Sequence, residues 1–272
     1  MRHALVALTF IGIALPSHAV DRERIRALNV IVQPAFTLIS GAIQGKVHTR
    51  TDVARCLLTG TAAGYGFYEA KTMASHGHLR TAWIIANAAA SVSTNASAGR
   101  NPFSRLQWIF GPIKAEISTP ADRSSNAVIH VSGSLNEAVA LVLMWRKSDS
   151  WHTQDGFLGF RKTHLYEAEG RRFQGYTYGI FPGRQIRTPP EIWNHEVIHA
   201  IQSIQADSVE PPACAFIARC GKPATERRII RFEHFHLGVI PALNGGILSR
   251  QSYQRRWMES EAYELAQGTR PF

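Results

Sequence analysis

Three segments near the start of the chain, residues 24–45, 50–72 and 79–98, are rich in Ala, Gly, Ile and Val and carry few charges. The pattern predicts three helices with small residues at their contact positions. The third segment approaches the length of a membrane span, but its Asn, Ser and Thr side chains would need partners in hydrocarbon. We therefore expect a buried helical bundle in preference to a transmembrane hairpin.

From about Ile113 to Phe181 the pattern changes to an alternation of apolar and polar residues, with the turn residues Asp155-Gly156 and Glu169-Gly170 between the runs. Alternation and turns of this kind are typical of antiparallel strands. The segment is too short for the eight strands of a closed membrane barrel. The chain is thus predicted to be an α+β protein whose antiparallel sheet packs on the helices.

The change of pattern also predicts how the chain is organised. Gly99-Arg100-Asn101-Pro102 interrupts the helical pattern. We expect an Ala/Gly-rich helical region over residues 20–110 and, over residues 111–272, a sheet with two later helices. The two regions are expected to form one compact, two-part domain.

The clearest helix signal covers residues 189–206. Thr188 and Glu191 have the spacing of a capping box, and prolines occupy the first turn. An apolar face follows, formed by Ile192, Ile198, Ile201 and Ile204. Pro211-Pro212 lies beyond the predicted end of the helix.

This helix carries His195-Glu196-Val197-Ile198-His199, an HExxH motif. Two histidines four residues apart lie on the same side of a helix, so both imidazoles can bind one Zn²⁺ ion. Glu196 lies about 100° round the helix and suits a general base that takes a proton from a zinc-bound water. The alternative is a pair of histidines with ordinary hydrogen bonds near the core.

A catalytic zinc site needs a third protein ligand. In the metzincin pattern a glycine and a histidine stand where this chain has Gln202 and Gln205, so that subclass is disfavoured. The C-terminal region offers glutamates as candidates. There, Trp257–Ala266 is predicted to be a helix that begins after Ser249 and ends before Gly268.

The C-terminal helix contains Glu259-Ser260-Glu261-Ala262-Tyr263. Together with the HExxH helix, it resembles the gluzincin-type zincin metallopeptidases, in which a second helix supplies the third ligand from an ExxxD or ExxAD signature. The resemblance covers these two helices and implies that Glu259 is the third ligand. It also implies that a sheet lies over the motif helix, and that the alternating segment before Pro189 binds an extended peptide at its edge.

Tyr263 departs from this signature, because the family commonly has an aspartate there that orients a zinc-bound histidine. A tyrosine hydroxyl or another carboxylate is left to take that role. Glu261 is a competing ligand, and a helix rich in glutamates also fits a solvated face. His234 and His236 can be proposed to stabilise an oxyanion, but they fit a half-buried strand better and are left out of the catalytic core.

The N-terminal residues 1–19 have the pattern of a signal peptide. Arg2 precedes the apolar run Ala4–Leu15, and Ser17-His18-Ala19 offers small residues for cleavage. The run is short of the roughly 20 residues that span a bilayer, so an uncleaved anchor is the alternative and not the first choice. The protein is expected to be exported and to be periplasmic, envelope-associated or secreted.

Cysteines and charge fit that location. Cys214 and Cys220 enclose a short loop that an oxidising compartment can close, which leaves Cys56 unpaired and buried. The formal net charge is +10, which fits a generally solvated basic surface best and is also compatible with association with an anionic membrane or cell envelope. We find no nucleic-acid motif, so nucleic acid is not an expected partner.

The sequence therefore predicts an exported zinc-dependent metallopeptidase that hydrolyses peptide bonds in a peptide or protein substrate. Its metal ligands are His195, His199 and Glu259, and its general base is Glu196. The alternative is a non-enzymatic envelope or membrane-associated protein with a structural or vestigial zinc site. A hydrolase of cell-wall peptide amides is a third reading, because a zinc hydroxide attacks other amides by the same chemistry.

Overall fold

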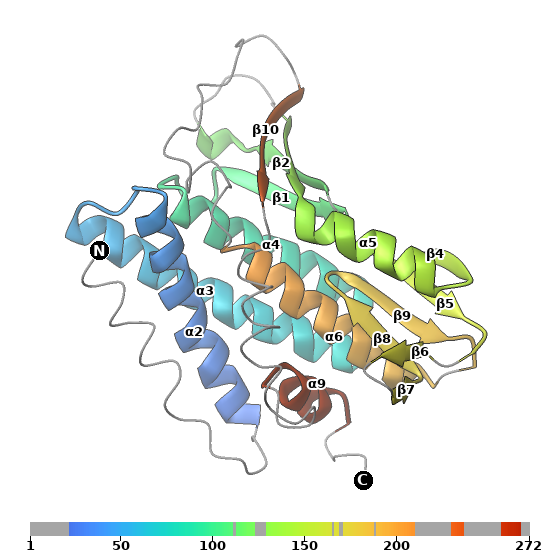
Figure 1. Cartoon of the computed structure of the whole chain (residues 1–272). Coiled ribbons are helices and arrows are strands. Elements are labelled where there is room, and N and C mark those ends of the chain that lie inside the picture. The colour runs from blue at the N-terminus through green and yellow to red at the C-terminus, as the bar shows by residue number, and fades with distance from the viewer. Residues whose placement is uncertain are drawn as a thin grey trace.

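Three long helices, α2 (Arg22–Ile43), α3 (Arg50–Ser75) and α4 (Leu79–Ser97), begin the described part of the chain (Figure 1). They confirm the three helices predicted from the apolar segments. The computed structural model describes residues 22–110, 113–122, 129–164, 166–168, 171–187, 189–209, 230–236 and 257–267. The predicted signal peptide and the pair Cys214 and Cys220 lie outside these residues.

Small residues bring the first two helices together. A Cβ atom on Gly60 would lie 2.4 Å from Cα of Pro34, and one on Gly64 would lie 2.2 Å from the backbone oxygen of Asn29. Only glycine allows backbones to approach this closely. Cys56, on α3, is a free and buried cysteine, as predicted.

The polar residues of α4 find their partners inside the protein. The side chain of Asn87 accepts a hydrogen bond from the backbone of Ile109 at 2.9 Å, and that of Ser91 accepts one from the backbone of Gln107 at 2.7 Å. These internal hydrogen bonds support the predicted buried helical bundle in preference to a transmembrane hairpin. Among the described helices, α2 has the length and apolar composition to cross a membrane, properties that core helices and signal sequences share.

Two four-stranded sheets follow. The first has the order β1 (Arg105–Phe110), β2 (Ile113–Ser118), β3 (Ile129–Ser134), β10 (Ile230–His236), with β3 and β10 parallel. The second, sheet B, has the order β4 (Ser150–Gln154), β5 (Phe157–Lys162), β9 (Phe181–Gln185), β8 (Gly175–Tyr178), with β5 and β9 parallel. The short strands β6 (Tyr166–Ala168) and β7 (Arg171–Phe173) form a separate pair.

The α+β class is confirmed, but the single antiparallel sheet expected over 113–181 is replaced by these mixed sheets. Helix α5 (Leu135–Lys147) separates them, and the side chain of Ser134 caps it by accepting from the backbone of Glu137 at 3.3 Å. The parallel pairing of β3 with β10 joins segments far apart in the chain, which local alternation does not encode. The predicted turn Asp155-Gly156 does join β4 and β5, with φ of 53° and 96°.

Both predicted site helices are present. Helix α6 (Pro190–Asp207) matches the prediction, although Pro189 is its N-cap without a side-chain hydrogen bond, and Thr188 lies outside the described residues. Helix α9 (Trp257–Gln267) matches the C-terminal prediction. The predicted flanking residues Ser249 and Gly268 also lie outside the description.

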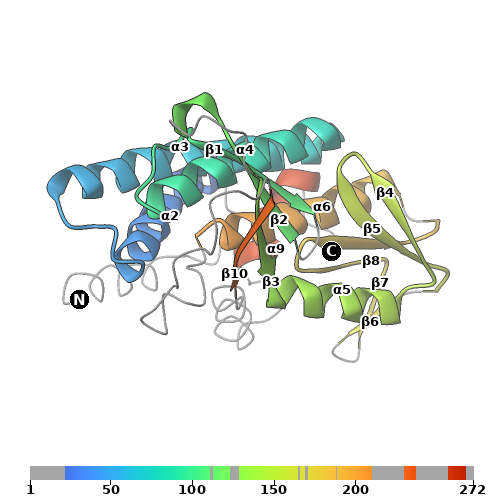
Figure 2. The same cartoon turned by 90° about the horizontal axis from the view of Figure 1, so that it is seen from above.

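Helix α6 lies at the centre of the fold (Figure 2). It packs on α3, α4 and α9, and its other side is covered by β8 and β9 of sheet B. Its apolar residues belong to a core that includes Phe67 of α3, Phe160 of β5 and Leu265 of α9. The HExxH motif is therefore held between helices and a sheet.

Candidate metal centre

His195 and His199 meet one turn apart on α6, as the motif spacing predicts. Their Nε2 atoms lie 3.1 Å apart, and their ring planes cross at 85°. The exposed fraction of His195 is only 5%. The helix is fixed at this point because the neighbouring Val197 and Ile198 are fully buried in the core.

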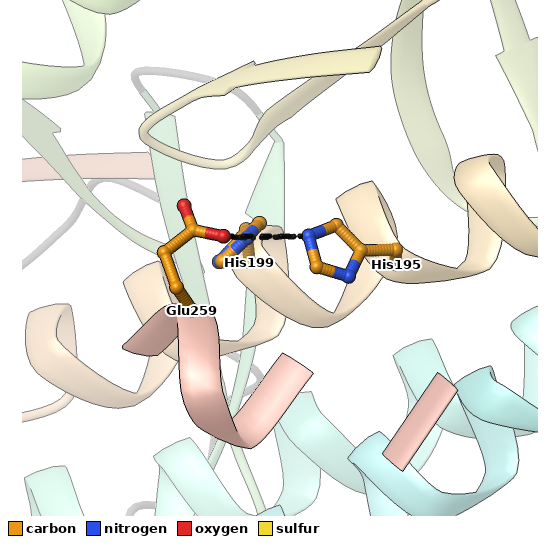
Figure 3. Close-up of side chains that lie close together, drawn as sticks. All are labelled: His195, His199 and Glu259. Atoms are coloured by element: carbon orange, nitrogen blue, oxygen red, sulfur yellow. Dashed lines mark hydrogen bonds and ion pairs between the residues drawn. The ribbon is translucent and has the colours of Figure 1, made fainter. Parts of the chain in front are cut away.

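Glu259 of α9 completes the cluster (Figure 3). Its Oε2 atom lies 3.5 Å from Nε2 of His195 and 3.4 Å from Nε2 of His199. The three residues that sequence analysis chose as ligands are thus brought together from two helices. The structure places Glu259 here because α9 packs along α6.

The three atoms have the arrangement that a metal ion needs. Their separations of 3.1, 3.4 and 3.5 Å are close to the edge of about 3.3 to 3.4 Å expected between ligands of a tetrahedral zinc site. Within the described residues, Oε2 of Glu259 is buried without a hydrogen-bond donor. Two imidazoles and one carboxylate are a common donor set for zinc, so these residues fit a metal ion.

The charges of the three groups are coupled. Burial alone would lower the pKa of His199, but Glu259, together with Glu196 and Gln202, outweighs burial and raises this pKa to about 9. Burial likewise raises the pKa of Glu259, yet the two histidines hold it well below its usual range. In the metal-free cluster, a proton on His199 therefore provides the positive charge that Glu259 requires.

Glu196 lies beside the triangle and outside it. It is 6% exposed, and its Oε2 atom accepts a hydrogen bond of 2.6 Å from the hydroxyl of Thr177 on β8. A Cβ atom on Gly175 would lie 2.5 Å from Oε1, so glycine leaves room for this carboxyl group. Burial raises the pKa of Glu196 above its usual value, although the two histidines and Thr177 oppose this shift.

Gln202 orients His199, a role that the sequence did not reveal. Its side-chain oxygen lies 2.7 Å from Nδ1 of His199, and its Nε2 atom donates to Oε2 of Glu261 at 2.6 Å and to the backbone of Met258 at 3.0 Å. In the sequence, Gln202 only disfavours the metzincin pattern, because it stands where that pattern has a glycine. The signal available was its position, close to one helical turn after His199.

Glu261, the competing ligand, points elsewhere. Its side chain is fully buried, and both carboxylate oxygens accept hydrogen bonds from Nζ of Lys71, at 2.9 and 3.0 Å. Asn29 donates to the same carboxylate at 2.6 Å. The solvated-face reading is therefore wrong for Glu261, and a buried ion pair occupies its oxygens.

Tyr263 contacts His195 with its ring. The two ring centroids are 4.5 Å apart, and the planes cross at 45°. Nδ1 of His195 is buried without a hydrogen-bond partner among the described residues, so the Tyr263 hydroxyl does not orient it there. His234 and His236 lie on β10, as the strand interpretation predicted, but their side chains lie outside the description.

Comparison with known proteins identifies no relative for this chain. No family model matches it, and searches of curated proteins and of solved structures find no significant match.

Proposed function

We propose that the protein is an exported zinc-dependent metallopeptidase of gluzincin type, with His195, His199 and Glu259 as ligands and Glu196 as general base. The observation that carries the proposal is a buried carboxyl group immediately outside the ligand triangle, held by Thr177. A structural site requires no such group. A carboxyl group with a raised pKa in this position suits proton transfer near neutral pH.

Bound zinc would supply Lewis-acid polarisation of the scissile carbonyl and would lower the pKa of a bound water to about 7. Glu196 takes the proton of the attacking water and returns it to the departing amine. Thr177 fixes the carboxylate through its hydroxyl group, whose single proton is shared between Oε2 and the backbone oxygen of Glu196, at 2.6 and 3.1 Å. Gln202 holds the imidazole of His199 through Nδ1.

Strand β8 supplies a surface for an extended substrate. Among the described strands it is the last of sheet B, pairs there with β9, and packs against α6. A peptide can add to such an edge by main-chain hydrogen bonds. Thr177 lies on this strand, so a peptide bound there would run close to Glu196.

The test is Glu196→Gln in the purified protein. We expect the variant to keep about one zinc per chain and the parental circular dichroism spectrum, while hydrolysis of casein and short peptides falls at least about a hundredfold. Unchanged turnover would exclude the general-base role. Activity confined to cell-wall fragments would instead assign the protein to cell-wall peptide amides.

A matched pair of substitutions tests the ligand assignment. Glu259→Gln should lose most of the zinc and remain folded, because the histidines that face it can release their proton when the carboxylate is removed, so that no uncompensated charge stays buried. Glu261→Gln should retain zinc and lose stability, because Lys71 would be left buried without its counter-charge. The reverse result would make Glu261 the ligand.

A non-enzymatic protein with a structural zinc site is the second candidate. The observation in its favour is Tyr263, which takes the place of the family's aspartate and contacts His195 without orienting it by a hydrogen bond. If the zinc site is structural, Glu196→Gln has the zinc content and circular dichroism spectrum of the parent. Removal of zinc by a chelator then lowers the melting temperature of parent and variant alike.

A further inference from the structure

Two arginines lie side by side on sheet B. Arg161 of β5 and Arg184 of β9 are direct partners in the parallel pairing of these strands, which places their backbones about 4.8 Å apart. Partners in register project to the same face, and like charges in this position destabilise a sheet. Within the described part of the chain, no carboxylate forms an ion pair with either guanidinium group.

Several buried nitrogen atoms near this arginine pair lack hydrogen-bond partners among the described residues. The guanidinium carbon of Arg184 lies 5.0 Å from the ring centre of Trp193 on α6, and the ring of His152 on β4 lies 5.3 Å from the same indole. Nε of Arg184, Nε1 of Trp193 and both ring nitrogens of His152 are buried without hydrogen-bond partners among the described residues. A buried N–H group without an acceptor is costly.

The local field is positive. The pKa of His152 falls to about 4, first because the ring is buried and then because Arg161 and Arg184 repel a proton there. Burial, followed by the charge of Arg161, also lowers the pKa of Arg184. An anion would relieve the repulsion between the two arginines and would accept hydrogen bonds from Nε of Arg184 and Nε1 of Trp193.

The cluster adjoins the proposed general base. Arg184 is paired in register with Gly175 of β8, the residue whose missing Cβ leaves room for Glu196. Paired residues share a face, so Arg184 projects to the side of sheet B that covers α6. Its stacking on Trp193, three residues before Glu196, agrees with this placement.

We propose that Arg161 and Arg184, with Trp193 and His152 beside them, form a carboxylate-binding site that selects substrates carrying a negative charge near the scissile bond. A carboxylate offers two oxygens to the fork of a guanidinium group. The role in substrate selection rests on the proposed peptidase function. The binding of a carboxylate to this site is independent of that function. The carboxylate belongs to the C-terminus of a peptide or to an acidic side chain.

The experiment follows the arginine Nε–H signals by ¹⁵N–¹H NMR of the full chain during titration with three probes. These are N-acetyl-Ala-Ala-Ala, its C-terminal amide, and N-acetyl-Ala-Glu-Ala amide. We expect saturable shifts of the Arg161 and Arg184 signals with a carboxylate probe and none with the first amide. The probe that binds more tightly identifies the source of the carboxylate.

Arg161→Gln and Arg184→Gln should each weaken binding about tenfold or more, and Arg184→Lys should retain part of it. The exposed Arg187→Gln is the matched control and should bind as the parent does. The same measurement in His195→Ala separates this site from the metal centre, and binding should persist there. Equal shifts with carboxylate and amide, no shift at all, or loss of binding in His195→Ala would overturn the proposal.

Discussion

Nζ of Lys71 lies 2.9 and 3.0 Å from the two carboxylate oxygens of Glu261, and both side chains are fully buried. Lys71 also donates to Asn29 and Gln205 at 2.8 and 2.7 Å, so its charged group is fully hydrogen-bonded. The pair joins α3 to α9, the helix that carries Glu259. Through Gln202, the same carboxylate is connected to His199.

Lys71→Met should therefore destabilise the protein by about 3 to 5 kcal/mol, since Glu261 would remain buried without a counter-charge. Urea unfolding of the metal-free protein measures the loss. The exposed Lys46→Met is the control and should be close to neutral. Recovery of most of the stability in the double variant Lys71→Met/Glu261→Leu would confirm that the unpaired charge is the cause, whereas an unchanged Lys71→Met variant would contradict it.

Gln202→Leu should weaken zinc binding by about ten- to a hundredfold, because it removes the partner that orients the His199 imidazole. Competition with a chromophoric chelator measures the affinity, and circular dichroism checks the fold. Gln44→Leu, directly after the end of α2, removes a glutamine whose side chain donates to Ser40, and this variant should bind zinc normally. Equal affinity in parent and Gln202→Leu would show that His199 needs no orienting partner.

Thr177→Val should lower the rate of peptide hydrolysis by about ten- to a hundredfold, because this factor corresponds to the free-energy contribution of a hydrogen bond to a charged group. Thr177→Ser keeps the hydroxyl and should stay close to the parent. The hydrogen bond from Thr177 lowers the pKa of Glu196, so its loss raises that pKa further. The acid limb of the pH–rate profile should then move to higher pH in Thr177→Val but not in Thr177→Ser, and coincident profiles would contradict this assignment.

Zinc affinity should rise with pH. The pKa of His199 in the metal-free cluster is raised to about 9, so below that pH a metal ion must displace its proton. For one proton, the apparent affinity should increase by about tenfold per pH unit between pH 7 and 9 and level off above that range. Chelator competition across this range is the measurement, and a flat profile would show that His199 is already neutral at pH 7.

Much of the site follows from the sequence. The helix over residues 189–206, the C-terminal helix and the choice of His195 and His199 depend on patterns confined to one helix each, whereas the choice of Glu259 came from the resemblance to the gluzincin signature. Helical periodicity and motif spacing are local properties, so they can be read without knowing the fold. The α+β class and the three N-terminal helices followed in the same way.

Tertiary structure alone decided which residues of different helices and strands are in contact at the site. Glu261 and Lys71 are 190 residues apart, and Thr177 approaches Glu196 only because β8 lies against α6. The pairing of Arg161 with Arg184 exists because two strands separated in the chain run parallel in register. A local pattern indicates which face of a helix or strand is apolar. The element that covers this face is selected by the packing of the whole chain. The partners of buried charges therefore appear only in the folded protein.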